Sequence, residues 1–378
     1  MAETIKNNVS IAFTGDITFT KYFNDLCDDE SLISADVVKF FNTSDYCVCN
    51  VEGPVTSDAD KKFKHRNNAL CMPWLKRLNG NVWSLANNHI DDFGEEGFVS
   101  TLNYAKENDC TVIGAGMNKA DASKPFTIDA CGGIGILAIG TNSCCNRAKE
   151  NEFGCLLWDE YETIKNAVRE IKKEFRWCVL VVHGGDEFAC LPMPYTRKKF
   201  LELLSFGADV IVGHHPHVVQ NYEIIDDKII FYSLGNFVFD TDYQRLQKNT
   251  EVGIGLKLNF TTDSVSWEHI AVKTDRENSQ HISLCETPDI FCDIQKNEYD
   301  KLWPLAAKAL YHTTKVRMRF IDKNVKGKKF TQLRWYLRLL KWCTDSEKKV
   351  ILKGKLLSLK GKKASNEAVK GYIADCMK

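Results

Sequence analysis

Short apolar runs alternate with helix-like segments along the first two-thirds of the chain. Each run ends in a polar or glycine turn, and a segment with helical spacing of its apolar residues follows. Runs that are short, uniformly apolar and rich in Val and Ile are typical of strands covered on both faces. The predicted strands are Val9–Phe13, Tyr46–Val51, Val82–Leu85, Thr111–Ile113, Gly135–Ile139, Cys178–Val182, Val210–Val212 and Ile229–Phe231.

Helices are predicted between these strands over Gly97–Asn108, Trp158–Phe175 and Thr196–Phe206. Alternation of strands and helices on this scale indicates a layered α/β domain. From about Val252 the pattern changes to strict alternation of apolar and polar residues. It predicts two antiparallel strands joined by the polar turn Thr261–Asp263, and this hairpin could close the edge of a sheet.

Beyond about Pro288 the chain turns helical, with predicted helices over Gln295–Thr313 and Phe330–Thr344. Val325–Lys329 and the lysine-rich stretch after Lys353 are predicted to be connections. We therefore expect a main domain over residues 9–275 and a basic helical region over residues 288–378. No internal repeat or low-complexity tract interrupts either one.

Composition indicates a folded, globular protein, because 44% of the 378 residues are hydrophobic. The formal net charge of zero hides an asymmetry. From about Gln295 onward, Lys and Arg are roughly three times as numerous as Asp and Glu, so the rest is acidic. An acidic body tolerates cations, whereas a basic region favours an anionic partner.

The segment FTQLRWYLRLLKWC, residues 330–343, places its leucines at helical spacing and its basic residues on another face. Such helices can lie on an anionic membrane or glycan surface, although packing against the main domain is the commoner arrangement. Peripheral contact with a membrane through the basic region is therefore the alternative to packing against the main domain. No nucleic-acid-binding motif accompanies the charge, so no nucleic-acid partner is expected.

The compartment is inferred from apolar runs and cysteines. No stretch of about eighteen apolar residues is present, and the N-terminus lacks the apolar segment of a signal peptide. We therefore expect a cytoplasmic protein, with membrane association through the basic region. The fifteen cysteines are scattered without a CxxC pair, and we expect them to be reduced and mostly buried.

Candidate chemistry lies at the carboxyl ends of five predicted strands. The residues there are Asp16, Glu52, Asn88, His183 and the pair His215 and His217. Alone, each has an ordinary structural explanation as a turn residue, a helix cap or a buried histidine. Together they converge at one rim, and their mixture of carboxylate, amide and imidazole suits Mn, Fe, Co or Zn. A carboxylate such as Glu52 can bridge two cations about 3.5–4 Å apart and so activate water for hydrolysis.

Six motifs make the resemblance specific: FTGDIT, NVEGPVT, SLANNHIDDFGEEG, VVHGGDEF, GADVIVGHHPHVVQ and FYSLGNFVFD. In this order, over about Val9 to Asp240, they resemble the CapA or poly-γ-glutamate capsule-synthesis family (PGA_cap), which is similar to calcineurin-like metallophosphatases. The resemblance implies an α/β fold, a four-layer α-β-β-α metallophosphatase-like sandwich with a C-terminal helical, basic extension. It also implies two divalent metal ions, Mn, Fe or Zn, and a phosphoesterase-type hydrolase in capsule or surface-polymer metabolism.

The resemblance also assigns roles to individual residues. Asp16 and His217 would bind the first metal, Glu52 would bridge, and Asn88, His183 and His215 would bind the second. His89 would be the general acid, and Asp91 and Glu187 would orient imidazoles. His214 is expected to point away, Asn236 to reach the same rim, and Pro216 to hold an extended backbone between the two histidines.

Two departures from the family pattern change the expectation. Thr18 stands where metallophosphatases often have a histidine, so the first metal would have one ligand fewer. Gly184 and Gly185 replace an aromatic residue, which predicts a more open pocket. The N-terminal membrane anchor of exported family members is not found either.

The substrate expected from the resemblance is an anionic polymer or a phosphorylated small molecule. The resemblance also implies a capsule-synthesis complex as the alternative to a membrane for the contact of the basic C-terminal region. Two other functions stay open. One is a non-hydrolytic polymer-binding subunit of a poly-γ-glutamate or capsule assembly complex, because a fold does not fix a function. The other is a hydrolase of γ-glutamyl amide bonds.

Overall fold

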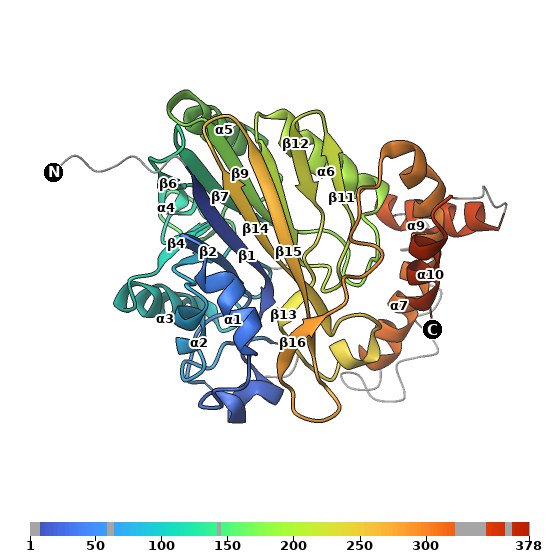
Figure 1. Ribbon diagram of the computed structural model, residues 1–378, viewed down its shortest axis with the longest axis horizontal. Coiled ribbons are helices and arrows are strands. Elements are labelled where there is room, and N and C mark those ends of the chain that lie inside the picture. The colour runs from blue at the N-terminus through green and yellow to red at the C-terminus, as the bar shows by residue number, and fades with distance from the viewer. Residues whose placement is uncertain (1–7, 59–63, 142–144, 322–344, 360–364, 378) are drawn as a thin grey trace.

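Two β-sheets form the centre of the molecule (Figure 1). The computed structural model describes residues 8–58, 64–141, 145–321, 345–359 and 365–377. One sheet has eight strands in the order β16-β15-β14-β1-β2-β3-β4, with β13 also paired to β1. These strands are β1 (Val9–Ile17), β2 (Tyr46–Val51), β3 (Val82–Ser84), β4 (Thr111–Ile113), β13 (Asn236–Val238), β14 (Val252–Phe260), β15 (Val265–Thr274) and β16 (Ile282–Cys285).

The second sheet has six strands in the order β11-β12-β10-β9-β7-β6. They are β6 (Phe126–Ile128), β7 (Ile134–Gly140), β9 (Trp177–His183), β10 (Val210–His214), β11 (Tyr222–Ile225) and β12 (Lys228–Phe231). A small third sheet pairs β5 (Ala115–Gly116) with β8 (Gly154–Cys155). All eight short apolar runs of the sequence are strands of the two large sheets.

Parallel strands make up one side of the first sheet and the middle of the second. Strands β1 to β4 run parallel in the first sheet, as do β7, β9, β10 and β12 in the second. The antiparallel hairpin β14–β15 is confirmed, but β16 pairs beyond it and forms the edge. Because the carboxyl ends of parallel strands point the same way, each sheet presents its loops at one rim.

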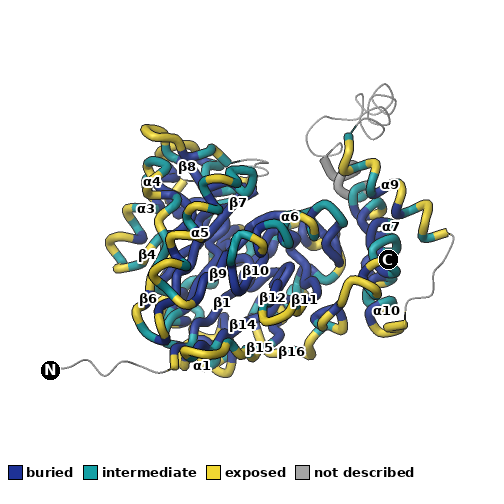
Figure 2. Tube along the Cα trace, turned by 90° about the horizontal axis from the view of Figure 1, so that it is seen from above, coloured by how far each residue is buried: buried dark blue, intermediate teal, exposed yellow. Residues whose placement is uncertain are grey.

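Side chains that alternate along the second sheet belong to two different cores, as the period of two in a strand requires. Leu180 and Ile211 pack on the helix side with Val168 of α5 (Tyr161–Glu174) and Phe200 of α6 (Pro194–Ser205). Their strand neighbours, such as Val181, join the large core shared with the first sheet. The interior is accordingly buried throughout (Figure 2).

The outer face of the first sheet is covered by helices from the N-terminal half. Phe41 of α1 lies against Gly255 of β14, and Tyr104 of α3 stacks on Trp83 of β3. The chain thus forms the predicted four-layer sandwich. The helices on this side are α1 (Ala35–Asn42), α2 (Pro73–Arg77) and α3 (Gly94–Glu107), and the short α4 (Lys119–Ala122) follows β5.

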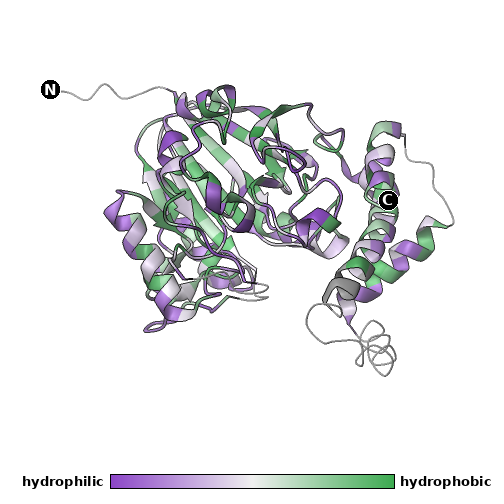
Figure 3. Ribbon diagram, turned by 90° about the horizontal axis from the view of Figure 1, so that it is seen from below, coloured by the Kyte–Doolittle hydropathy of each residue, from purple (hydrophilic) through white to green (hydrophobic). Residues whose placement is uncertain are grey.

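The C-terminal helices α7 (Lys296–Ile321), α9 (Ser346–Ser358) and α10 (Glu367–Asp375) pack together at one side of the sandwich (Figure 3). The hydroxyl of Tyr299 donates to the carbonyl of Pro192, which ties α7 to the main body. The stretch after Lys353, predicted as a connection, continues α9 to Ser358. Helix α9 packs closely against α7 because Gly354 has no side chain, and a Cβ there would clash with side chains of α7.

The predicted helix Phe330–Thr344 and the predicted connection Val325–Lys329 lie outside the described residues. Within the described part of the chain, no helix combines the length and apolarity that crossing a bilayer requires.

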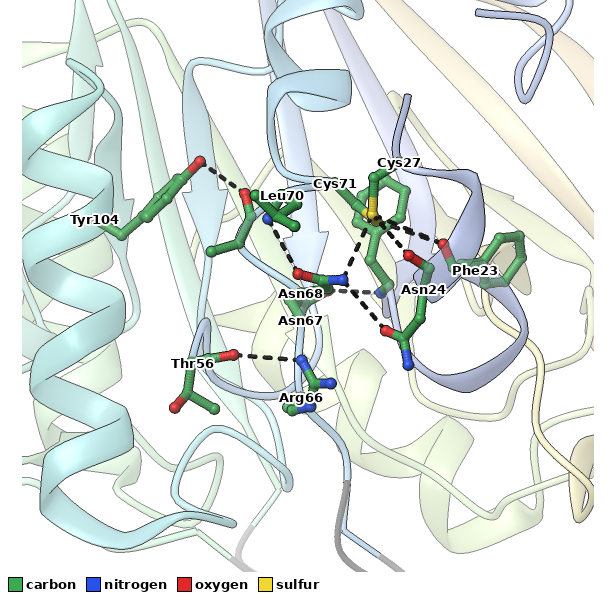
Figure 4. The surroundings of a disulfide bond; sticks show 12 residues. Phe23, Asn24, Cys27, Thr56, Arg66, Asn67, Asn68, Leu70, Cys71 and Tyr104 are labelled. Atoms are coloured by element: carbon green, nitrogen blue, oxygen red, sulfur yellow. Dashed lines mark hydrogen bonds between the residues drawn. A yellow bond between two sulfur atoms is a disulfide. The ribbon is translucent and has the colours of Figure 1, made fainter. Parts of the chain in front are cut away.

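A disulfide joins Cys27, at the end of the 3-10 helix Lys21–Leu26, to Cys71 (Figure 4). The expectation that the cysteines are reduced is therefore wrong for this pair. The two residues are 44 positions apart, and only the packing of the two segments brings them together. The other described cysteines are free, and most of them are buried.

Substituting Gly213 tests how closely the second sheet is packed. A Cβ on Gly213 of β10 would lie 2.1 Å from the backbone oxygen of Tyr232. Because backbone cannot rotate away, Gly213→Ala is expected to lower the free energy of unfolding by about 1–3 kcal/mol in denaturant titrations. Gly371→Ala in α10, where no atom lies within 4 Å, is the control and should raise it by about 0.4–1 kcal/mol. Equal stability of both variants would contradict the packing.

Candidate metal centre

Residues from both sheets meet at the rim where the parallel strands end. The first sheet contributes Asp16 near the end of β1, Glu52 directly after β2 and Asn88 after β3. The second sheet contributes His183 at the end of β9 and the loop after β10. All six predicted ligands are at most 5% exposed: Asp16, Glu52, Asn88, His183, His215 and His217.

Three of the ligands predicted for the second metal are in mutual contact. Nε2 of His183 lies 2.7 Å from Oδ1 of Asn88. Nδ1 of His215 lies 3.1 Å from the same oxygen and 3.2 Å from Nε2 of His183. Separations of about 3 Å are those expected for donor atoms about 2.1 Å from one common ion.

The predicted first-metal ligands are also adjacent. Oδ2 of Asp16 lies 3.2 Å from Nδ1 of His217, and its Oδ1 accepts a hydrogen bond from Nδ2 of Asn50 at 2.9 Å. Asn50 also lies 3.2 Å from Nδ1 of His183. It was not singled out in the sequence, although it lies in β2 two residues before Glu52, a spacing that puts two side chains on the same side of an extended chain.

Glu52 lies between the two groups. Its Oε1 is 3.9 Å from Nε2 of His183 and 3.7 Å from Nε2 of His217. Asp16, Glu52 and His183 form the one group of three carboxylate and imidazole residues in the described chain whose donor atoms all lie within 4.8 Å of one another. This is the position expected for a bridging carboxylate.

The Glu52 carboxylate provides the test of whether the site fits cations. Both of its oxygens are fully buried and receive no hydrogen bond from any residue that the structure describes. Burial raises the pKa of Glu52 well above its ordinary value. An ionised carboxylate in such surroundings is unfavourable unless a cation compensates it. The donor set therefore fits bound divalent metal ions.

The imidazoles have the electrostatics of ligands. Burial, and next the charge of His215, hold the pKa of His183 well below its ordinary value. Burial lowers the pKa of His215 to about 4. Both rings are thus neutral near pH 7 and have a lone pair available for a metal. His217 differs: burial lowers its pKa, but the carboxylates of Glu52 and Asp16 outweigh this and raise it to about 9.

The backbone around Pro216 is not extended, contrary to the prediction. His215 and His217 have φ values of +97° and +58°, in the left-handed region that non-glycine residues rarely adopt. Such conformations cost about 1–3 kcal/mol each and persist where the surroundings enforce them. They direct His215 toward Asn88 and His217 toward Asp16. The two histidines thus face different groups of candidate ligands, as predicted, but through left-handed backbone conformations rather than an extended backbone.

His214 does not point away. It pairs with His183 in the parallel register of β10 and β9, so both side chains lie on the same face of the sheet. Its Nδ1 lies 3.3 Å from Oδ1 of Asp16, and the side chain is buried. Burial raises the pKa of Asp16, but its contacts with His214 and His217 outweigh this and hold the pKa well below its ordinary value.

His89, the predicted general acid, borders the site with Nε2 3.8 Å from Oε1 of Glu52. Its Nδ1 lies 2.7 Å from Oδ2 of Asp92. The prediction that Asp91 orients an imidazole is wrong, because its carboxylate accepts the backbone N–H of Asn146 instead. Asp92 could have been recognised as the partner of His89 from the sequence, because a spacing of three residues places both side chains on one side of a tight turn.

The charge of the Glu187 carboxylate opposes the effect of burial on the pKa of His215 without outweighing it. Asn236 reaches the rim as expected, with Oδ1 3.0 Å from Nδ1 of His217. Thr18, at the position of the missing histidine, donates its hydroxyl hydrogen bond to the backbone carbonyl of Glu52. It therefore holds the segment that carries the bridging carboxylate.

The predicted opening at Gly184 does not exist. A Cβ on Gly184 would lie 2.4 Å from the indole ring of Trp158, so an aromatic side chain from another segment fills this space. Sequence reasoning missed Trp158 because it precedes α5 and comes to the strand end only through the tertiary fold.

Comparisons with known proteins agree with this geometry. The family model described as "Bacterial capsule synthesis protein PGA_cap" matches residues 10–241. The PGA biosynthesis protein CapA of Bacillus subtilis is 34% identical over 264 residues, which cover 67% of this chain and 69% of that protein. The capsule biosynthesis protein CapA of Bacillus anthracis is 28% identical over 268 residues, which cover 67% of this chain and 65% of that protein.

Among solved structures, the calcineurin-like phosphoesterase YfkN from Bacillus subtilis aligns with 72% of this chain and 93% of its own, at 12% identity and a TM-score of 0.41. A likeness this low adds nothing to the assignment, which depends on the family model and the curated relatives. The matched region contains β2, all of β1 except its first residue, and every residue of the candidate metal centre. The chain belongs to the bacterial capsule synthesis protein family PGA_cap.

Proposed function

We propose that this protein is a dinuclear metal-dependent hydrolase of the phosphoesterase type that acts in capsule or surface-polymer metabolism. The observation that carries the proposal is the Glu52 carboxylate, which lies buried between two sets of candidate metal-ligand side chains and has no hydrogen-bond donor within the described parts of the chain. A site that only bound a polymer would have no need to bury this charge. Family membership supports the link to poly-γ-glutamate or polysaccharide capsule synthesis.

The chain's own residues would divide the work as follows. Asp16 and His217 would hold the first ion, Glu52 would contact both, and Asn88, His183 and His215 would hold the second. Divalent ions there would lower the pKa of a bound water and offset negative charge on a phosphoryl group.

His89 would protonate the leaving oxygen. Its Nδ1 is occupied by Asp92, so Nε2 is the atom that faces the substrate side. The Asp92 carboxylate would fix the ring orientation.

Metal content is the first test. Protein purified without chelators is expected to contain about two transition-metal ions per chain by elemental mass spectrometry, because a bridging carboxylate implies a two-metal site. His215→Ala should lose one or both ions. His269→Ala is the matched control, since that histidine lies on β15 and pairs with Thr287. Absence of metal after reconstitution with Mn or Zn would refute the proposal.

Removing the acid should separate chemistry from binding. If phosphoester hydrolysis is detected in a screen of phosphomonoesters and phosphodiesters, His89→Ala should lower kcat by about 10²–10⁴-fold while both ions stay bound. Asp92→Asn should lower kcat by roughly ten- to a hundredfold. Asp91→Asn is its control and should change little, because Asp91 contacts the backbone of Asn146.

The same variants distinguish the other functions. A non-hydrolytic polymer-binding subunit would show no turnover of any substrate and would bind polymer equally well after His89→Ala. A γ-glutamyl amide hydrolase would need the same metal ligands but would cleave γ-glutamyl peptides and leave the phosphoesters intact. Including γ-glutamyl peptides in the screen therefore decides between the two hydrolases.

A further inference from the structure

Asn236 contacts the candidate metal centre without belonging to the predicted ligand set. It is the first residue of β13, lies beside Asp16 in the parallel register and is 3% exposed. Its Nδ2 donates to the backbone carbonyl of Thr250 at 2.7 Å and to Oε1 of Gln244 at 3.2 Å. A carbonyl can only accept, so the amide nitrogen must face Thr250. The amide oxygen is thereby directed at Nδ1 of His217, 3.0 Å away.

This orientation determines which nitrogen of His217 carries a proton. Nδ1 faces two acceptors, Oδ1 of Asn236 and Oδ2 of Asp16 at 3.2 Å. A hydrogen on Nδ1 satisfies both contacts, whereas a lone pair there would face oxygen lone pairs. The lone pair of the neutral ring then lies on Nε2, which faces Glu52 at 3.7 Å. In metal sites the partner of the second ring nitrogen fixes the tautomer in this way.

A buried polar network holds the Asn236 amide from behind. Arg276 donates through Nη2 to the Thr250 carbonyl at 2.9 Å and through Nη1 to the Thr250 hydroxyl at 2.8 Å. Its Nε lies 3.1 Å from Oδ1 of Asp240, a fully buried carboxylate. Because Arg276 binds the carbonyl that receives the Asn236 hydrogen bond, it fixes the position of that acceptor.

Arg245 provides a control for the role of Arg276. Its guanidinium also binds Asp240, at 2.6 and 2.8 Å, and it donates to Gln280. Within the described residues its hydrogen bonds go to Asp240 and Gln280 and none goes to Thr250, so Arg245 is outside the chain of contacts from Asp240 to His217. Arg245 and Arg276 both bind Asp240, but only Arg276 also binds Thr250, so the two substitutions should differ in their effect on metal affinity.

We propose that Asn236 is a positioning residue that sets the tautomer and orientation of His217, and that Arg276 holds it in place through Thr250. The inference depends on the proposed metal site and adds that the affinity of one of its two ions is set by residues that never touch it. If Asn236 only stabilised the loop after β13, its substitution would leave the metal affinity unchanged.

The test is a Mn²⁺ titration by calorimetry of the metal-depleted full chain. Asn236→Ala is expected to weaken one of two binding events by roughly ten- to a hundredfold, the usual effect of losing a partner of a metal-bound histidine, and to leave the other unchanged. Long-range ¹H–¹⁵N spectra of the Zn²⁺-loaded protein should show His217 protonated on Nδ1 in the wild type, and this signal should weaken in Asn236→Ala.

The arginine pair keeps the test decisive if Asn236→Ala does not fold, which circular dichroism would show. Arg276→Gln should weaken the same binding event, whereas Arg245→Gln should not. Two ions bound with wild-type affinity in Asn236→Ala and Arg276→Gln would overturn the inference while leaving the proposed function standing. Wild-type protein that binds no Mn²⁺ or Zn²⁺ would overturn both.

Discussion

A buried concentration of charge at the meeting point of two sheets is the constraint on which the rest of the structure depends. Glu52 and Asp16 are both fully buried, and the side chains nearest to them are imidazoles and amides. Carboxylates are unfavourable in such surroundings unless each has a compensating partner. The parallel strands, the left-handed turns around Pro216 and the network behind Asn236 all serve to bring partners to these two carboxylates at contact distance.

Much of this arrangement could be predicted from the sequence, for a definite physical reason. Strands covered on both faces are uniformly apolar, so β7, β9 and β10 are visible without any partner. A polar residue that directly follows such a run, as His183 and Glu52 do, must lie at the sheet rim. The ligand types could thus be identified even though the distances between them could not.

What the sequence did not reveal depends on contacts between distant segments. The orientation of His214 follows from its register opposite His183, and the space at Gly184 is filled by Trp158. The Cys27–Cys71 bond likewise requires that two separate segments be packed together. Local propensity carries no information about any of these pairings.

The distribution of the ligands along the chain also has a consequence for folding. Asp16 contacts the backbone of His215, 199 residues away, and Asn88 contacts His183, 95 residues away. Contacts of such high sequence separation form late, after the loops between them have been closed. Neither sheet alone contains a complete set of donors, so a cation can be captured only once the two halves have docked. A bound metal ion would then cross-link the two sheets. Metal binding during refolding would therefore measure the docking of the sheets and not the formation of any single strand.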